Sequence, residues 1–341
     1  MGHSTLMMSD NSLYPLVSVI TPSYNQGEFL EDTIKSVLAQ DYPSIEYLIV
    51  DGGSTDGSVD IIQKYHSQLA WWVSEPDDGQ ASAINKGMSH ARGEIVAWLN
   101  SDDLYLPGAV RQAVEGFQAN QQIGMVFGNA LTIDAEGCPI KELIFPDWEL
   151  QDLIGFRIIC QPAVFMDRTS YERVAGLDLN YHFMLDHHLW IRIANLKPIM
   201  HIPNFWAAAR HHKSAKNISQ AAEFGRETLE LLEWMQSQPD LALIVEQNKR
   251  NVLAGAYRLN ARYLLDGGQY ADSLKSYANA FLYQPKYTLS HWHRILFAML
   301  GLLGVRNLDG FYTRFQDTRR PNLRGTAALD DWPGLCIKQA E

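Results

Sequence analysis

The stretch that decides the fold is EIVAWLNSDD, residues Glu94–Asp103. Its apolar run is typical of a buried strand, and it ends in a small residue followed by the paired carboxylates Asp102 and Asp103. A parallel α/β sheet would present these carboxylates at the carboxyl end of the strand, where such sheets bind their ligands. Neighbouring carboxylates repel each other unless a cation or hydrogen-bond donors lie between them. A divalent ion that bridges phosphate oxygens meets that need, and the alternative is an Asp pair that caps the turn before a helix at 108–119.

The sequence around this stretch alternates between strand and helix signals. Short β-branched or aromatic runs predict strands at Val17–Thr21, Ile45–Val50, Trp71–Ser74 and Ile95–Leu99. Apolar residues at helical spacing separate them, which predicts a mostly parallel sheet flanked by helices. From Ser219 onward the signal is nearly all helical. The expected domains are a flexible N-terminus (1–13), an α/β domain (14–216), a helical C-terminal region (217–318) and a tail (319–341).

Composition narrows the class of protein. The 341 residues carry a formal charge of −11, so no basic surplus is present to bind nucleic acid. The three cysteines show no CxxC spacing, which is typical of a reducing compartment and argues against a thiolate zinc site. No signal pattern begins the chain, and the longest uncharged apolar run, Ile295–Val305, is about half of a membrane span. We therefore expect a cytoplasmic protein, with a peripheral position at the inner face of the plasma membrane as an alternative.

Polar residues follow each of the four predicted strands. The first runs into TPSYN, the second into DGGSTD, the third into EPDDGQ and the fourth into NSDD. Asp51 stands where a carboxylate can accept from a pyrimidine imide or a ribose hydroxyl, and Gly52 and Gly53 would let a base approach the backbone. Residues 54–56 are more typical of helix caps. Because the four strand ends converge at one sheet edge, they predict a nucleotide site.

Two segments carry a family resemblance. VSVITPSYNQGEFLEDTIKSVLAQDYPSIEYLIVDGGSTDGS (17–58) and DDGQASAINKGMSHARGEIVAWLNSDD (77–103) resemble the family 2 glycosyltransferases with the GT-A fold. The resemblance extends from Leu16 to Lys216. It implies transfer of a sugar, with inversion, from a nucleotide-diphosphate donor (UDP-linked in our prediction) to a hydroxyl of a saccharide or lipid-linked acceptor. It also implies Mn²⁺ or Mg²⁺ as cofactor and a role in bacterial surface polysaccharide synthesis.

The resemblance assigns the donor-binding residues. The nucleotide-sugar positions fall on Thr21, Pro22, Tyr24, Asp51, Gly53, Asp78, Gln80, Asn85, Asn100, Ser101, Asp102, His212 and Lys216. The metal positions fall on Asp102, Asp103 and His212. Many relatives read DxDD where this chain has NSDD, and the sequence leaves open which of Asp102 and Asp103 binds the metal. His212 and Lys216 belong to the segment RHHKSAK (210–216), whose alternative is an exposed basic loop.

The acceptor side rests on QPAVFMDRTSYERVAGLDLNYHFMLDHHLWIRIA, residues Gln161–Ala194. This segment resembles the acceptor half of the same family, which implies that Asp186 is the general base. Apolar residues follow Asp186 at helical spacing, so it is predicted near a helix N-terminus, where the dipole favours its ionised form. The alternative is a plain N-cap aspartate. His188 occupies a place where relatives often carry Asp, so we expect it to affect acceptor binding.

The C-terminal third is less specific. Asn251–Pro285 resembles one tetratricopeptide repeat, which cannot bury its own apolar face and must pack on the catalytic domain or a partner. His291–Phe315 carries an apolar stripe with basic flanks, typical of a core or dimer helix, with a membrane interface as the alternative. The competing function is a catalytically inactive nucleotide-sugar-binding or scaffold protein that acts through this helical region.

Overall fold

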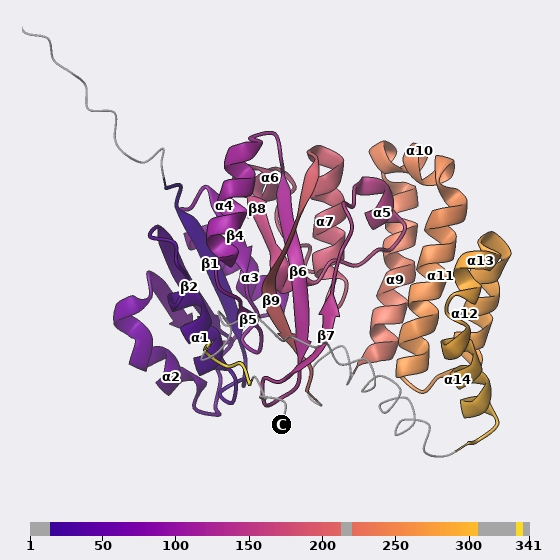
Figure 1. Ribbon diagram of the computed structural model, residues 1–341, viewed down its shortest axis with the longest axis horizontal. Coiled ribbons are helices and arrows are strands. Elements are labelled where there is room, and N and C mark those ends of the chain that lie inside the picture. The colour runs from indigo at the N-terminus through magenta and orange to yellow at the C-terminus, as the bar shows by residue number, and fades with distance from the viewer. Residues whose placement is uncertain (1–13, 213–219, 306–331, 337–341) are drawn as a thin grey trace, which may run out of the picture.

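The computed structural model describes residues 14–212, 220–305 and 332–336. A sheet flanked by helices forms one half of the molecule, and a group of C-terminal helices stands beside it (Figure 1). The strands are β1 (Val17–Ser23), β2 (Ile45–Asp51), β3 (Trp71–Ser74), β4 (Ile95–Trp98), β5 (Leu104–Tyr105), β6 (Met125–Ile133), β7 (Pro139–Leu143), β8 (Val164–Asp167) and β9 (Ile199–Arg210). The helices among them are α1 (Leu30–Leu38), α2 (Ser58–Tyr65), α3 (Gln80–His90), α4 (Ala109–Ala119), α5 (Leu150–Ile154), α6 (Arg168–Arg173) and α7 (Leu185–Leu196).

The sheet has a parallel half and a mixed half. Its order is β3-β2-β1-β4-β8-β6-β9-β5, with β7 added to β6. The pairs from β3 to β4 are all parallel, which confirms the strands and crossovers that the sequence predicted. Beyond β4 the direction changes, because β8 runs antiparallel to both β4 and β6 while β9 is parallel to β6. The carboxyl ends of β1, β2 and β4 therefore meet at one edge, as a ligand site requires.

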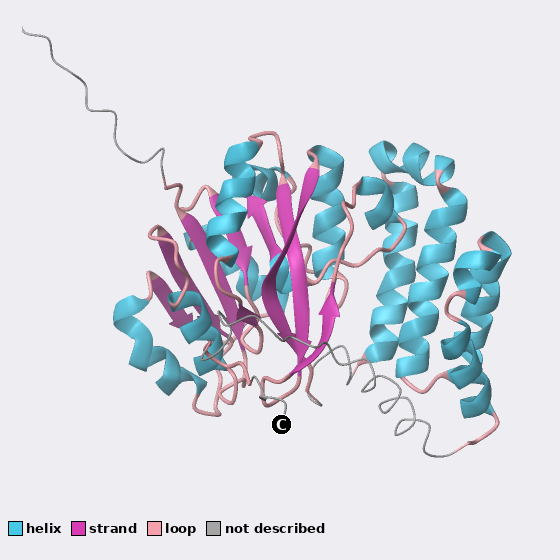
Figure 2. Cartoon of the chain, in the orientation of Figure 1, coloured by secondary structure: helices cyan, strands magenta, loops and turns pink. Residues whose placement is uncertain are grey.

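Two apolar layers cover the sheet, one on each face. Every residue of β1 and β4 is buried, as expected for strands packed on both sides (Figure 2). One layer contains apolar residues of α1 and α4, and the other contains those of α3 and α7. The second layer continues without interruption into the C-terminal helices, so the two parts of the chain share one hydrophobic core.

The C-terminal helices pack against α5 and α7. They are α9 (Ala221–Ser237), α10 (Pro239–Gln247), α11 (Lys249–Asp266), α12 (Tyr270–Tyr283), α13 (Pro285–Leu289) and α14 (Trp292–Leu302). Gly255 lies so close to Gly155 that an added Cβ would sit 2.1 Å from the Gly155 carbonyl oxygen. The helix pair α11–α12 occupies the segment that resembles a tetratricopeptide repeat, and the Asn260 amide donates to Ser276 across it. The structure thus confirms that this segment packs on the catalytic half.

Helix α14 differs from the expected core helix. Of its side chains only Ala298 is buried, while Trp292, Met299 and Leu302 are more than half exposed. Part of the predicted basic flank, Arg306 and Arg314, lies outside the described residues. No helix in the described part of the chain has the length and apolarity to cross a bilayer. Contact with a second copy or with a membrane surface remains a prediction.

A short segment within the predicted tail lies against the catalytic half. In residues 332–336, the Trp332 indole N–H donates to the Tyr105 carbonyl at 2.7 Å. The Cys336 N–H donates to the Gly137 carbonyl at 3.0 Å. Specific contacts therefore hold this segment against β5.

Candidate active site

The loops after β1 and β2 are bound to each other. The Gly52 N–H donates to the Ser23 carbonyl at 2.8 Å, and the Asn25 N–H donates to Ser54 Oγ at 2.8 Å. In return, Asn25 Oδ1 accepts the Thr55 N–H at 2.9 Å. These bonds join two of the four strand-end segments that were predicted to converge at the edge of the sheet.

Asp51 sits beneath this edge with no exposed surface. Its carboxylate accepts from the N–H groups of Gly53 and Ser54 at 3.1 and 2.9 Å, and from the hydroxyls of Ser54 and Ser74 at 2.5 and 2.7 Å. Gly53 has φ +82°, a conformation that favours glycine. In this geometry Asp51 shapes the 51–54 turn. Direct contact of its carboxylate with a nucleotide stays a prediction.

Of the three residues predicted at the β1 end, one has an accessible side chain. Thr21 is buried and shares a hydrogen bond with the Tyr47 hydroxyl at 2.9 Å, and Pro22 is buried beside it. Tyr24 is 64 % exposed and adjoins Gly52. Its ring is therefore accessible to a ligand, whereas Thr21 and Pro22 are not.

The third and fourth strand ends are joined through amides. Gln80 Nε2 donates to Asn100 Oδ1 at 2.8 Å, and Asn100 Nδ2 donates to Asp103 Oδ2 at 3.2 Å. Asp78 is exposed beside them, and Ser101 is buried in the turn. Gln80 and Asn100 therefore belong to one polar chain that leads to Asp103.

Asn85 binds the end of α6 and the loop after it. Its Oδ1 accepts the Tyr171 hydroxyl at 2.6 Å and the Leu177 N–H at 3.0 Å, while its Nδ2 donates to the Leu177 carbonyl at 2.8 Å. Asn85 thus anchors the 171–177 segment, and its contact with the donor stays a prediction.

The paired carboxylates face in different directions. Asp103 is 5 % exposed, and its Oδ1 accepts the Arg210 backbone N–H at 2.9 Å. Burial and the neighbouring Asp102 charge raise the pKa of Asp103 well above its usual range. The Asp102 side chain is 20 % exposed, and its Oδ2 lies 3.0 Å from His212 Nε2. The two candidate metal ligands therefore differ in position. Asp102 contacts His212, whereas Asp103 binds the backbone at the end of β9.

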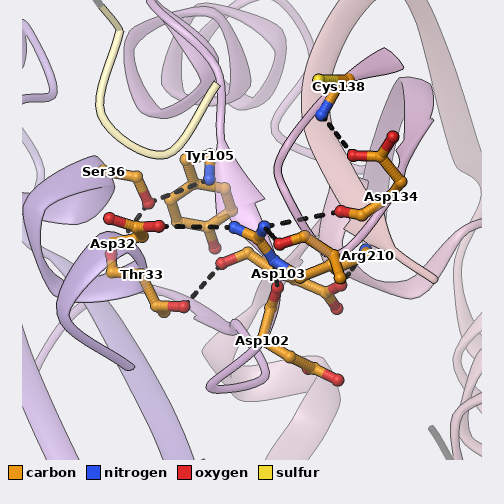
Figure 3. A network of polar contacts seen from close by, with 10 residues as sticks. Asp32, Thr33, Ser36, Asp102, Asp103, Tyr105, Asp134, Cys138 and Arg210 are labelled. Carbon is orange, nitrogen blue, oxygen red and sulfur yellow. Dashed lines mark hydrogen bonds and ion pairs between the residues drawn. The ribbon is translucent and has the colours of Figure 1, made fainter. Parts of the chain in front are cut away.

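Arg210, to which the sequence assigned no role, holds this arrangement together (Figure 3). Its Nε donates to the Asp102 carbonyl at 3.0 Å, and its Nη1 donates to the Ala135 carbonyl at 2.7 Å. Its Nη2 lies 3.6 Å from Asp32 Oδ2, and the guanidinium covers the Phe29 ring at 4.9 Å. By fixing the end of β9 against the 102–103 turn, Arg210 places His212 at Asp102. In the sequence, the one sign of this role was the spacing of Arg210 and His212 in the segment RHHKSAK.

The pair Asp102–His212 fits a divalent ion. A carboxylate oxygen and an imidazole nitrogen are both ligands for Mn²⁺, and an ion of this kind commonly takes its other ligands from substrate phosphates and water. Among the described residues no group of three His, Cys, Asp or Glu side chains forms a complete protein cage. A metal bound by this pair would take its remaining ligands from water or substrate oxygen atoms. Lys216, the other predicted residue of this segment, lies outside the described residues.

Asp186 lies in the first turn of α7, as predicted, but it is not the N-cap. Met184 occupies that position, and the Asp186 Oδ1 accepts the adjacent His187 N–H at 2.6 Å. Burial raises the pKa of Asp186 to about 6, against the opposing effect of this N–H. Burial raises the pKa of the nearby Cys160 thiol, and the charges of Asp103 and Asp186 add to this effect.

His188 lies in the core beside α9. It is 1 % exposed, and its ring centroid lies 4.2 Å from that of Tyr181 and 4.3 Å from that of Trp234. Burial lowers the pKa of His188 to about 2, so the ring is neutral. From this position we expect no direct contact with an acceptor.

Comparison with known proteins shows the family of the chain. The family model "Glycosyl transferase family 2" matches residues 18–142. An uncharacterised glycosyltransferase of Mycobacterium tuberculosis is 33 % identical over 186 residues, which cover 53 % of this chain and 69 % of the relative. The putative teichuronic acid biosynthesis glycosyltransferase TuaG of Bacillus subtilis is 36 % identical over 159 residues, which cover 45 % of this chain and 63 % of TuaG.

Solved structures agree with the fold. Residues 1–349 of TarS from S. aureus superpose with a TM-score of 0.58 at 15 % identity, covering 89 % of this chain and 88 % of that one. The mannosyltransferase PcManGT of Pyrobaculum calidifontis, solved with GDP-Man and Mn²⁺, gives 0.55 at 22 % identity, covering 85 % and 87 %. Both likenesses span the C-terminal helices as well as the sheet. The chain belongs to the family 2 glycosyltransferases and is an enzyme of the GT-A fold.

Proposed function

We propose that this glycosyltransferase moves a sugar, with inversion, from a UDP-linked donor to a hydroxyl of a saccharide or lipid-linked acceptor. The observation that carries the proposal is the 3.0 Å contact between Asp102 and His212, which unites two segments distant in sequence at the edge where the nucleotide loops end. TarS has been solved with UDP-GlcNAc, which supports a nucleotide-sugar donor of this class. The name of TuaG supports an acceptor in surface polysaccharide synthesis.

The donor would lie along the edge formed by the 23–27 and 51–56 loops. Tyr24 offers an exposed ring, and the 51–54 turn offers backbone beneath the base. Asp102 and His212 would hold Mn²⁺ or Mg²⁺ at the diphosphate. That ion supplies positive charge that offsets the charge of the leaving nucleoside diphosphate.

Asp186 would accept the proton of the attacking acceptor hydroxyl. A base works best when its pKa lies near the working pH, because it is then largely ionised yet still basic. The Asp186 pKa of about 6 satisfies both conditions near neutral pH. Inversion needs one displacement at the anomeric carbon, and the acceptor oxygen loses its proton to the carboxylate as the bond to the diphosphate oxygen breaks.

A thermal-shift panel tests this function. The protein is heated with UDP-glucose, UDP-N-acetylglucosamine or GDP-mannose, each with Mn²⁺, Mg²⁺ or EDTA. A ligand at about 100 times its Kd stabilises the folded state by about 2.7 kcal/mol, so a bound donor should raise the melting temperature. Because the metal is proposed to hold the diphosphate, this rise should appear only when metal is present. Slow release of nucleoside diphosphate from that donor then measures the chemistry. Metal-independent shifts with no release would instead indicate a binding protein without catalysis.

A further inference from the structure

Glu227 of α9 makes a contact that bears directly on the acceptor side of the site. It is 1 % exposed, although it carries an ionisable side chain. One carboxylate oxygen accepts the His182 N–H at 2.9 Å, and the other accepts the N–H groups of Phe183 and Met184, each at 2.8 Å. Among the residues that the structure describes, no Lys or Arg forms an ion pair with Glu227.

These three N–H groups are consecutive and lead into α7. Helix α7 begins at Leu185, and no side chain of its own N-cap residue satisfies its first N–H groups. Glu227 instead binds the N–H of the N-cap Met184 and the two N–H groups before it, and a carboxylate at this end also interacts favourably with the helix dipole. Hydrogen bonds to an ionised acceptor are about twice as strong as neutral ones. Glu227 therefore fixes the segment that enters α7 from a distant part of the chain.

Asp186 is the second residue of the helix that this contact fixes. We propose that Glu227 is a positioning residue for the base Asp186, so that the C-terminal helices form part of the catalytic machinery. The inference rests on the proposed function, because it takes Asp186 as the base. The Glu227 charge also acts on Asp186 directly, adding to the effect of burial in raising its pKa.

The variant that tests this is Glu227→Gln, which keeps the shape of the side chain and removes its charge. Misplacement of a reacting group by about 1 Å costs about 100-fold in rate, so turnover should fall by about 10- to 100-fold. The affinity for the nucleoside diphosphate, measured by calorimetry with Mn²⁺, should stay within about threefold. In the pH profile of kcat/KM the acid limb should move to lower pH, because removal of a nearby negative charge lowers the pKa of Asp186.

A purely structural role would not move that acid limb. Turnover is measured as release of nucleoside diphosphate from whichever of UDP-glucose, UDP-N-acetylglucosamine and GDP-mannose is hydrolysed fastest. The matched control is Glu223→Gln, one turn earlier on α9, where the carboxylate is exposed and pairs with Arg226. It removes the same charge from the same helix and should leave both turnover and pH profile unchanged.

The outcomes separate the two proposals. If Asp186→Asn keeps near-normal turnover, the proposed base is wrong. If Asp186→Asn is inactive while Glu227→Gln keeps its turnover and its acid limb, only the role of Glu227 is overturned. If Glu227→Gln does not fold, Glu227→Asp takes its place, since it keeps the charge but is too short to reach all three N–H groups. Turnover of that variant within about threefold of the parent would overturn the inference.

Discussion

The donor side and the acceptor side of this site are built in different ways. On the donor side, loops that follow neighbouring parallel strands bind one another, and Asp51 is satisfied by groups from its own turn and from the end of β3. On the proposed acceptor side, the proposed base Asp186 stands on a helix whose entry is held by Glu227, a residue of the C-terminal helices. The loops proposed to bind the nucleotide thus belong to the parallel half-sheet, and the proposed metal pair adds His212 from the end of β9. The proposed acceptor side adds a residue of the C-terminal helices.

Electrostatics follow the same division. The donor side separates its two carboxylates, with Asp103 buried under Arg210 and Asp102 placed at His212. On the proposed acceptor side, burial raises the pKa of Asp186 to about 6. Removal of a donor-side group should therefore affect binding and metal dependence together, while removal of the acceptor-side group should affect the chemical step alone.

The largest effect is expected from Asp186→Asn. The amide keeps the shape of the side chain but cannot take the acceptor proton, and a general base contributes about 10²–10⁴-fold in rate. Turnover should fall by that factor, while the calorimetric affinity for nucleoside diphosphate with Mn²⁺ stays near normal. A variant that turns over within a few-fold of the parent would show that the base lies elsewhere. An equal loss of nucleotide affinity would show that the two sides are not separate.

A smaller effect is expected on the donor side, and it should differ between the paired carboxylates. Asp102→Asn removes a proposed metal ligand, so turnover should fall by about 100-fold and the difference in nucleotide affinity between Mn²⁺ and EDTA should disappear. Asp103→Asn alters a supporting contact, for which losses of about 10- to 100-fold in metal affinity are typical. Calorimetric titration of each variant with and without metal tests this order. A larger loss of metal-dependent affinity in Asp103→Asn than in Asp102→Asn would indicate that Asp103 is the metal ligand.

The sequence predicts one side of the site much better than the other, and the reason is physical. Each of the strands β1, β2, β3 and β4 is followed directly in the sequence by its own polar motif. Short stretches of sequence are therefore enough to predict both the strand and the motif. Arg210 and Glu227 act through backbone groups far away in the chain, and a contact to a backbone N–H leaves no trace in the partner's residue type. The contact of Asn85 with the backbone of Leu177 leaves equally little trace in the sequence.

Acidic pH should inhibit the enzyme through Asp186. The base works when ionised, and its pKa is raised by burial to about 6. Activity should therefore be fully present above that pH and fall about tenfold for each pH unit below it. The measurement is kcat/KM against pH in the range where nucleotide binding is unchanged, with Asp186→Asn as the control that should lack this limb. A limb that persists in Asp186→Asn would assign it to another group.

The smallest effect on turnover is expected from His188→Ala, although His188 lies two positions after the proposed base Asp186 on α7. Its ring is packed between Tyr181 and Trp234, and neither ring nitrogen has a hydrogen-bond partner within the described residues. Truncation should leave a cavity and lower the free energy of unfolding by about 1–3 kcal/mol. Turnover per folded molecule should remain within about twofold, and His188→Phe, which fills the same space, should recover stability to within about 1.5 kcal/mol of the parent. Urea unfolding beside steady-state kinetics gives both quantities. Because the imidazole is neutral and shielded from the site, a selective rise in acceptor KM at unchanged stability would mean that the acceptor reaches behind α7, contrary to the packing described above.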